Sequence, residues 1–167
     1  IYEGADAVML SGETTIGSYP VECVKFIKRI ADKTEKYRTL GYEDKLIATT
    51  DWQHLGIAAK TIAQSIEADG IIAITRSGTT AEIVSNAKPY RMPVFAFSNN
   101  KKTLQHLSLA GSVNAYYTSL PKDHEKNISG ILNFLKKELN PEKIMKFVVI
   151  SGILSESSAD AIEIRNL

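Results

Sequence analysis

Apolar residues recur along the chain in two patterns, and the two patterns alternate. Short runs that are apolar throughout predict buried strands at residues 70–75, 93–98, 113–118 and 146–152. Between the runs, apolar positions spaced three and four residues apart predict helices at residues 51–68, 79–88 and 100–110. A further helix has one apolar face, made of Ile128, Ile131, Leu132, Leu135 and Leu139. Buried strands separated by helices indicate a parallel sheet covered on both faces.

The last residues, 161–167, alternate between apolar and polar positions, which predicts a half-exposed fifth strand. The loop before it is too short for the crossover that a parallel strand needs, so this strand should lie antiparallel at an edge. The predicted fold is therefore α/β, with a mostly parallel five-stranded sheet and one antiparallel edge strand.

The beginning of the chain has a pattern of its own. The run ADAVMLSGE predicts a buried strand over Ala7–Leu10, followed by a Ser-Gly turn. Pro20 stands at a helix start, where its missing N–H costs little. The helix after it has apolar positions at helical spacing: Val21, Val24, Ile27, Ile30, Ala31 and Thr34. Residues 38 to about 48 show no period and predict a linker, with a new domain beginning near Thr49 and a helix capped by Thr50 or Asp51.

Composition adds limits on the class of partner. A formal net charge of +1 provides no field that would attract nucleic acid or a membrane surface, so neither partner is expected. The single cysteine, Cys23, excludes an internal disulfide and any multi-cysteine metal site, and a reducing cytoplasmic setting is the simplest one. The histidines His54, His106 and His124 are too scattered to suggest a metal site. The chain begins without Met and directly in an apolar strand, so we expect it to be part of a longer protein.

The candidate chemistry lies in the turn after the first strand of the alternating region. In open α/β sheets, ligands gather at the carboxyl ends of strands beside helix N-termini. Gly78 lets the backbone approach closely, Arg76 adds a positive charge, and hydroxyls come from Ser77, Thr79 and Thr80. With the free N–H groups of the next helix, these residues could form an anion cradle.

The same residues also have a purely structural interpretation. Thr79 followed three residues later by Glu82 is a capping box, which would satisfy the helix end internally. Every strand-to-helix turn needs a cap, and small polar residues usually supply it. The turn alone therefore leaves both interpretations open.

The N-terminal segment resembles a known family. The stretch GADAVMLSGETTIGSYPVECVKFIKRI, Gly4–Ile30, is similar to the last strand, loop and last helix of the catalytic barrel in pyruvate kinases. The rest of the chain looks like the C-terminal domain of that family, including a T-x-S-G-x-[ST]-A turn formed here by Thr75, Ser77, Gly78, Thr80 and Ala81. The resemblance implies a barrel remnant at residues 1–40 and a C-terminal effector-binding and subunit-interface domain at residues 41–167.

The resemblance also implies an activity for the intact enzyme. That activity is phosphoryl transfer from phosphoenolpyruvate to ADP, with magnesium and usually potassium. The family residues that bind these metals and the enolate lie in earlier barrel strands, so we expect this chain to have no catalytic residue, no bound metal and no kinase activity. Glu13 is the only acidic residue in the matched loop, and we favour a loop hydrogen-bond acceptor over a metal ligand, because a lone carboxylate makes a poor metal site.

For the turn, the resemblance implies an effector phosphate held by Thr75, Arg76, Ser77, Gly78, Thr79 and Thr80, from a sugar phosphate or a nucleotide. Two departures from the family pattern bear on this expectation. Thr79 stands where many family members have Arg or Lys, and the second effector loop reads GILSESSADA, with Glu156 and Asp160 but no basic residue. Acidic groups raise the cost of binding phosphate, so a monophosphate is expected rather than a bisphosphate, and an enzyme insensitive to effectors stays open.

Two rival functions remain. The stretch TRSGTTAEIV also resembles the sugar-phosphate turn of sugar isomerase domains, although the barrel-like segment has no role there. Alternatively, the domain serves only assembly and binds no small molecule. Whether the pyruvate kinase domain binds an effector or serves only assembly, the resemblance implies that its partners are other copies of the chain. It implies a homo-oligomer, with a tetramer for the intact enzyme. Since the predicted strand at Ala7–Leu10 lacks both barrel neighbours, we expect another copy or an unusual docking of its helix to order this end.

Overall fold

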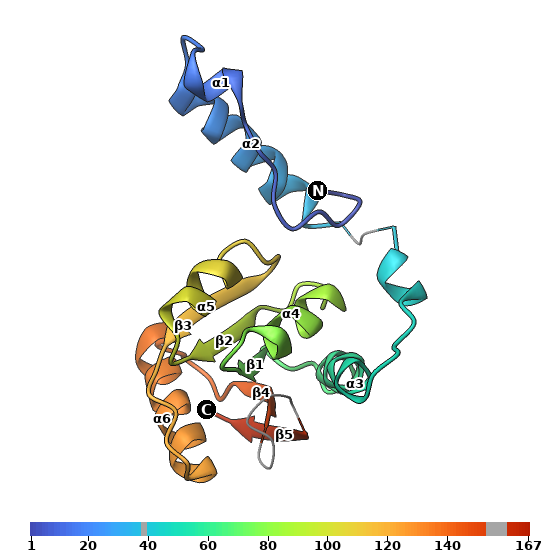
Figure 1. The fold of residues 1–167 in the computed structure, drawn as a ribbon, viewed down its shortest axis with the longest axis vertical. Coiled ribbons are helices and arrows are strands. Elements are labelled where there is room, and N and C mark those ends of the chain that lie inside the picture. Colours follow the sequence, from blue (N-terminus) through green and yellow to red (C-terminus); the bar gives the residue numbers. More distant parts are fainter. Residues whose placement is uncertain (38–39, 153–159) are drawn as a thin grey trace.

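The computed structural model describes residues 1–37, 40–152 and 160–167, and it divides the chain into two visibly different parts (Figure 1). The N-terminal segment, residues 1–37, contains the short helix α1, Gly12–Thr15, and the longer helix α2, Pro20–Thr34. It extends away from a sheet domain that contains all the described strands. A 3-10 helix, η1, Tyr42–Lys45, lies between the two parts within the predicted linker.

The sheet belongs to the predicted class. Its strands are β1, Gly70–Ile74; β2, Val94–Ser98; β3, Val113–Tyr117; β4, Lys146–Ser151; and β5, Ala161–Asn166. In the described residues they form one five-stranded sheet in the order β3-β2-β1-β4-β5. Every pair is parallel except β4 with β5. The mostly parallel sheet with one antiparallel edge strand is therefore confirmed.

Four helices cover the two faces of the sheet. On one face, α3, Asp51–Ser65, α4, Thr79–Asn86, and α5, Lys101–Leu107, pack through small and aliphatic residues such as Ala63, Val84 and Leu107. On the other face, α6, His124–Leu139, packs Ile128, Ile131 and Leu135 against β1, β2 and β4. Because β1, β2 and nearly all of β4 are buried from both sides, they read in the sequence as continuous apolar runs.

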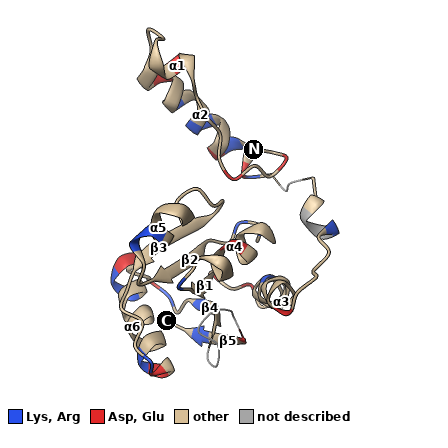
Figure 2. Ribbon diagram, in the orientation of Figure 1, with Lys and Arg blue, Asp and Glu red and all other residues tan. Residues whose placement is uncertain are grey.

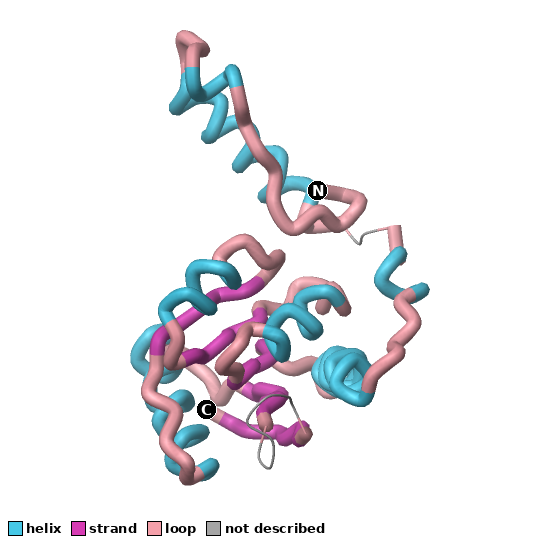
Figure 3. Tube along the Cα trace, viewed as in Figure 1, coloured by secondary structure: helices cyan, strands magenta, loops and turns pink. Residues whose placement is uncertain are grey.

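The predicted strand at Ala7–Leu10 is wrong. These residues lie in an irregular segment before α1, which Figure 3 draws as a loop. Ala7, Val8 and Met9 are exposed to solvent. A strand exists only where neighbouring strands accept and donate its backbone hydrogen bonds, and no strand of the described residues pairs with this segment. The apolar run by itself is therefore not enough to form a strand.

The helix predicted after Pro20 is confirmed, with Pro20 in the first helical turn. None of its residues is buried, and apolar side chains including Val21, Val24 and Phe26 are exposed. Charges of both signs lie along α2 (Figure 2), and Lys28 pairs with Asp32 at 2.8 Å. Charges of both signs are therefore interspersed along this helix (Figure 2).

Helices α3 and α4 approach each other closely because α3 carries small residues on its buried face. Gly56, Ala59 and Ala63 share that face. A Cβ added at Gly56 would lie 2.3 Å from Cγ2 of Ile83, well inside van der Waals contact. Ile83 is β-branched and therefore stiff about its first side-chain bond, so it cannot easily move aside.

We expect Gly56→Ala to lower the free energy of unfolding by about 1–2 kcal/mol, because overpacking at the α3–α4 contact outweighs the gain in helix propensity. Gly130→Ala is the matched control, since a Cβ at Gly130 in α6 meets nothing within 4 Å and should stabilise the helix by up to ~1 kcal/mol. Urea denaturation followed by circular dichroism measures both. Equal stabilities for the two variants would contradict the close packing.

A charged network joins the first turn of α6 to the edge strand β5. Glu163 accepts hydrogen bonds from Arg165 and pairs with His124, while Arg165 also pairs with Glu125. Partial burial by itself would raise the pKa of Glu163, but hydrogen bonds from His124 and Arg165 and their positive charges outweigh burial and hold the pKa below its ordinary value of 4.5. The network thus ties β5 to the helix that covers its inner face.

A carboxylate whose pKa is lowered by folding stabilises the protein above its unfolded pKa, and that stability is lost as the pH falls through the folded value. We therefore expect Glu163→Gln to destabilise the chain at pH 6, with the difference from the unmodified chain shrinking below about pH 4.5. The measurement is the urea midpoint between pH 3 and pH 7. The exposed Glu142→Gln is the control and should show no such pH-dependent difference.

Candidate functional site

The turn between β1 and α4, residues 75–80, lies where the direction of strand order changes. From β1 the chain continues to β2 and β3 on one side, and it then returns to β4 on the other side of β1. The helices that leave β1 and β3 consequently cover opposite faces of the sheet. The carboxyl ends of β1 and β4 form the switch point at which open α/β sheets bind ligands, so the six predicted site residues stand at the favoured edge.

Thr75 shapes the turn from the inside. Its backbone N–H donates to the carbonyl oxygen of Phe97 at 3.0 Å, which continues the parallel pairing of β1 with β2. Its side-chain Oγ1 accepts a buried hydrogen bond of 2.9 Å from the N–H of Gly78. The residue is 5% exposed. Thr75 therefore holds the backbone of the turn in place rather than presenting its side chain on the surface.

Gly78 is required by both its backbone and its surroundings. Its φ of 101° lies in the left-handed region, which side chains other than hydrogen rarely allow. A Cβ at this position would also lie 3.3 Å from Cγ2 of Thr103 and 3.6 Å from Cδ2 of Leu107. The turn thus rests directly on α5.

The carbonyl of Arg76 is fixed by two residues that the sequence analysis did not single out. Thr103 in α5 donates its hydroxyl to this carbonyl at 2.8 Å, and Ser98 at the end of β2 donates at 3.4 Å. Ser98 was detectable, because it ends an apolar run and neighbouring parallel strands end at the same edge. Thr103 gave no comparable signal. The side chain of Arg76 is exposed.

The capping-box interpretation of this helix start is wrong. The N-cap of α4 is Gly78, and no side chain caps the helix, so Thr79 is already the first helical residue. Glu82, which the capping box would direct back to the helix end, instead pairs with His106 of α5 at 2.8 Å. The left-handed glycine moves the helix start one residue earlier than the box requires.

The helix end consequently keeps donors that the protein does not use. The N–H of Thr79 has a long contact of 3.4 Å with Oγ of Ser77. Within the described part of the chain, the N–H groups of Thr80 and Ala81 have no hydrogen-bond acceptor. The hydroxyls of Ser77 and Thr79 lie 3.0 Å apart beside them. These N–H groups lie at the positive end of the helix, beside two hydroxyls whose hydrogen bonds run to neighbours in the same turn, and they are chemically suited to an anion.

Charged residues around the turn are mixed in sign. Arg76 is the basic residue of the turn itself, and Lys101 and Lys102 begin α5, next to the Thr103 that holds the turn. Glu82 places a carboxylate in the first turn of α4, where His106 can offset its charge when protonated. The two lysines are candidate cations that the sequence analysis overlooked, and their position just after the second strand is the signal that it could have used.

The predicted second effector loop, GILSESSADA, lies mostly outside the described residues. Glu156 is among the residues not described, so the acidic character of this loop near the turn stays a prediction. Asp160, at its end, donates its backbone N–H to the carbonyl of Ser151 at 3.0 Å. The end of β4 and the start of β5 therefore lie at the same edge of the sheet as the turn.

The loop residue Glu13 behaves as expected for a hydrogen-bond acceptor. Its Oε2 accepts a hydrogen bond of 2.9 Å from the N–H of Ser11. Hydrogen bonds from its own N–H and from that of Ser11 lower the pKa of Glu13. In the described part of the chain, His, Cys, Asp and Glu side chains nowhere gather in a group of three that could hold a metal ion.

No helix within residues 1–37, 40–152 and 160–167 has the length and apolarity needed to cross a membrane.

Comparison with known proteins identifies the family. The sequence pattern of the family described as "Pyruvate kinase, alpha/beta domain" matches residues 53–164, which include the turn. The chain belongs to the pyruvate kinase family. It is 34% identical to a pyruvate kinase from Agrobacterium vitis over 91% of this chain, and 32% identical to one from Thermoplasma acidophilum over 95% of it. These matches cover 33% and 26% of the two relatives.

The structural comparison agrees. The crystal structure of a pyruvate kinase from Cryptosporidium parvum superposes with a TM-score of 0.83, covering 97% of this chain and 33% of that chain, at 24% sequence identity. The chain thus spans between a quarter and a third of the length of these relatives. Because the family match includes the turn, pyruvate kinase is favoured over a sugar isomerase domain.

We expect Thr75→Val to lower the free energy of unfolding by about 1–3 kcal/mol. Valine has nearly the same shape but leaves the buried N–H of Gly78 without an acceptor. Thr79→Val in the same turn is the control, since Thr79 is exposed and its loss of a hydroxyl should change stability by less than about 0.5 kcal/mol. Chemical denaturation measures both, and a Thr75→Val chain as stable as the control would show that this hydrogen bond does not hold the turn.

Proposed function

We propose that this chain is the C-terminal regulatory and assembly part of a pyruvate kinase. The intact enzyme would transfer phosphate from phosphoenolpyruvate to ADP, giving pyruvate and ATP in glycolysis, in the cytoplasm. Family membership and the quarter to third of the relatives' length that the chain spans support this assignment. Residues 1–40 would be the end of the catalytic barrel, and residues 41–167 the effector-binding and subunit-interface domain.

The chain itself should be inactive. Phosphoryl transfer of this kind needs carboxylates for Mg²⁺ and a cation for the transferring phosphoryl group. The described residues contain no group of three potential metal ligands, and the carboxylate of Glu13 is occupied by backbone N–H groups, so the donor set does not fit a magnesium or potassium site. We therefore assign no catalytic step to these residues.

The regulatory role is a phosphate site at residues 75–80. The observation that carries it is the start of α4, where N–H groups without an acceptor in the described residues lie beside the hydroxyls of Ser77 and Thr79 at the switch point of the sheet. In this site the N–H groups of Thr79, Thr80 and Ala81 would hold phosphate oxygens. Ser77, Thr79 and Thr80 would donate hydroxyl hydrogens, and Arg76 would supply charge.

The residues of the site have separate tasks. Thr75 and Gly78 set the shape of the turn, and the carbonyl of Arg76 anchors it to β2 and α5. Only the remaining hydroxyls and N–H groups would meet the ligand. Because Glu82 adds a carboxylate near the helix start, the mixed charge favours a monophosphate from a sugar phosphate or nucleotide over a bisphosphate.

Assembly is the second part of the proposal. Other copies of the chain are the expected partners, and the intact enzyme would be a tetramer. Exposed apolar residues support an assembly role, because they are found in both parts of the chain, including Trp52 at the start of α3 and Phe26 in α2. A domain that serves assembly alone remains the alternative if the turn binds no phosphate.

Titration of the chain with inorganic phosphate, glucose 6-phosphate and AMP, followed by NMR of the backbone amides, tests the site. We expect saturable shifts at Gly78 and Thr80, and a double substitution Ser77→Ala/Thr80→Ala that weakens binding about tenfold or more, equivalent to at least ~1.4 kcal/mol. Ser129→Ala is the control, because Ser129 is an exposed residue of α6 on the opposite face of the sheet. Absence of binding by the unmodified chain at millimolar ligand would leave assembly as the function.

A further inference from the structure

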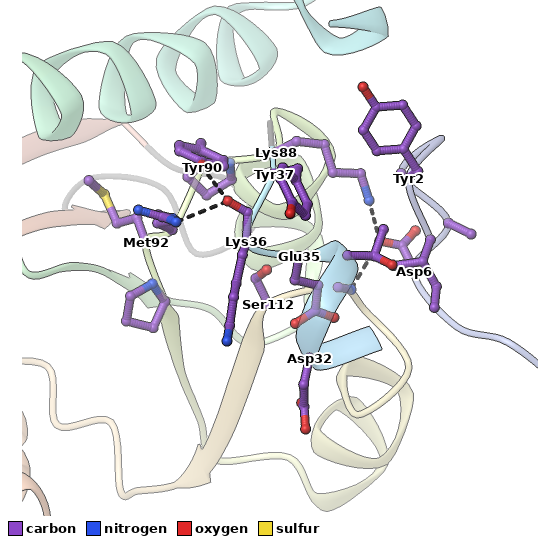
Figure 4. A pocket seen from close by; sticks show the side chains of 18 of the residues that line it. Tyr2, Asp6, Asp32, Glu35, Lys36, Tyr37, Lys88, Tyr90, Met92 and Ser112 are labelled. Carbon is purple, nitrogen blue, oxygen red and sulfur yellow. Dashed lines mark hydrogen bonds and ion pairs between the residues drawn. The ribbon is translucent and has the colours of Figure 1, made fainter. Parts of the chain in front are cut away.

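The N-terminal segment touches the sheet domain through a small set of polar contacts around one cavity. The cavity, of about 710 Å³, lies between the beginning of the chain, the end of α2 and the loops that follow α4 and α5 (Figure 4). The carbonyl of Lys36 accepts hydrogen bonds of 2.9 Å from the hydroxyl of Tyr90 and from the guanidinium of Arg91. On the other side of the cavity, Asp6 makes the second contact.

One carboxylate oxygen of Asp6 joins two loops of the sheet domain. Its Oδ1 pairs with the ammonium of Lys88, just after α4, and accepts a hydrogen bond of 3.0 Å from the N–H of Gly111, just after α5 (Figure 4). The same Gly111 is also tied to α4, because the hydroxyl of the buried Ser85 donates to its carbonyl at 2.8 Å. Asp6 therefore fastens the ends of α4 and α5 to each other and to the N-terminal segment.

Gly111 makes this contact sterically specific. A Cβ at Gly111 would lie 2.6 Å from Oδ1 and 3.5 Å from Cα of Asp6. The φ of Gly111 is outside the left-handed region, so alanine is allowed by the backbone and only the carboxylate stands in its way. The absence of a side chain at this position is what lets the carboxylate reach the N–H.

The other ends of α4 and α5 lie at the candidate phosphate turn, residues 75–80. Helix α4 begins at Gly78 and Thr79 and ends near Lys88, a span of about 12 Å over its eight residues. Helix α5 supplies Thr103, which holds the carbonyl of Arg76, at one end and leads to Gly111 at the other. Because Thr103 of α5 holds the carbonyl of Arg76, a shift of α4 against α5 would disturb the turn.

We propose that Asp6 acts as a latch that couples the docking of the N-terminal segment to the phosphate affinity of residues 75–80. The latch rests on the proposed phosphate site, because it is the contact that would couple this site to the N-terminal segment. With the latch closed, α4 and α5 are fixed relative to each other and the turn is organised to bind. With it open, the turn loses part of that organisation. By linkage, phosphate in turn favours the docked segment.

The sharpest test is Gly111→Ala, which displaces the Asp6 carboxylate without changing any charge. Inorganic phosphate is titrated into the 167-residue chain and followed by NMR at Gly78 and Thr80. We expect a loss of affinity of about fivefold, the size of a modest coupling between sites. Gly130→Ala is the matched control, because a Cβ there meets nothing within 4 Å, and its affinity should stay within twofold.

A second pair of variants separates the latch from simple electrostatics. Asp6→Asn and Glu3→Gln each remove one negative charge from the same segment. Electrostatics alone would make either loss strengthen phosphate binding. Glu3 is exposed, and no ion pair of Glu3 occurs within the described residues, so Glu3→Gln shows that general effect alone. We expect Asp6→Asn to weaken phosphate binding about fivefold relative to Glu3→Gln.

Hydrogen exchange of the Gly111 N–H supplies a readout that does not depend on affinity. Phosphate should slow this exchange in the unmodified chain and should fail to slow it in Asp6→Asn. If the unmodified chain binds phosphate while Gly111→Ala and Asp6→Asn bind it within twofold of their controls, the latch is overturned and the phosphate site stands. If the unmodified chain binds no phosphate, both are overturned.

Discussion

The burial of β1 between two parallel neighbours is the constraint from which the rest of the structure follows. All five residues of β1 are buried, and the strand pairs in parallel with β2 on one side and β4 on the other. A parallel neighbour on each side demands crossover helices, and the return from β3 to β4 must cross the opposite face from α4. This arrangement places the carboxyl end of β1 at a switch point. The turn after β1 therefore lies at the edge where open α/β sheets bind ligands, and the strands beside it hold the backbone of β1.

In the N-terminal segment, residues 1–37, an apolar run has no neighbouring strand among the described residues and forms no strand. Ala7–Leu10 is as apolar as the strands of the sheet, yet it is irregular and largely exposed, because no strand among the described residues pairs with its backbone. Helix α2, by contrast, forms from its own hydrogen bonds and keeps its predicted start at Pro20. A helix makes its backbone hydrogen bonds within itself, whereas a strand needs a neighbouring strand to make them. The two elements of this segment differ for that reason.

The sequence predicted the sheet, its helices and the position of the candidate site, because these depend on periodicity and on rules of connection. It could not predict how the turn is held. The Thr79–Glu82 spacing indicated a capping box, but the left-handed Gly78 and the long-range pairing of Glu82 with His106 replaced it. Likewise, Thr103 reaches Arg76 from 27 residues away, and no local pattern contains such a contact. Spacing describes neighbours along the chain, whereas the turn is determined by neighbours across the sheet.

The arrangement of the turn explains why its residues should not be treated as equivalent ligands. Thr75 and Gly78 are engaged within the protein, and the carbonyl of Arg76 is engaged with β2 and α5. In the proposed phosphate site, this internal bonding would leave Thr75 and Gly78 without a direct contact to the ligand, but it would hold the N–H groups at the start of α4 in place. An anion that meets ordered donors does not have to order them, so this bonding would add to the affinity of the proposed site. The same bonding makes the turn sensitive to α5, because Thr103 makes the shorter of the two hydrogen bonds that hold the carbonyl of Arg76.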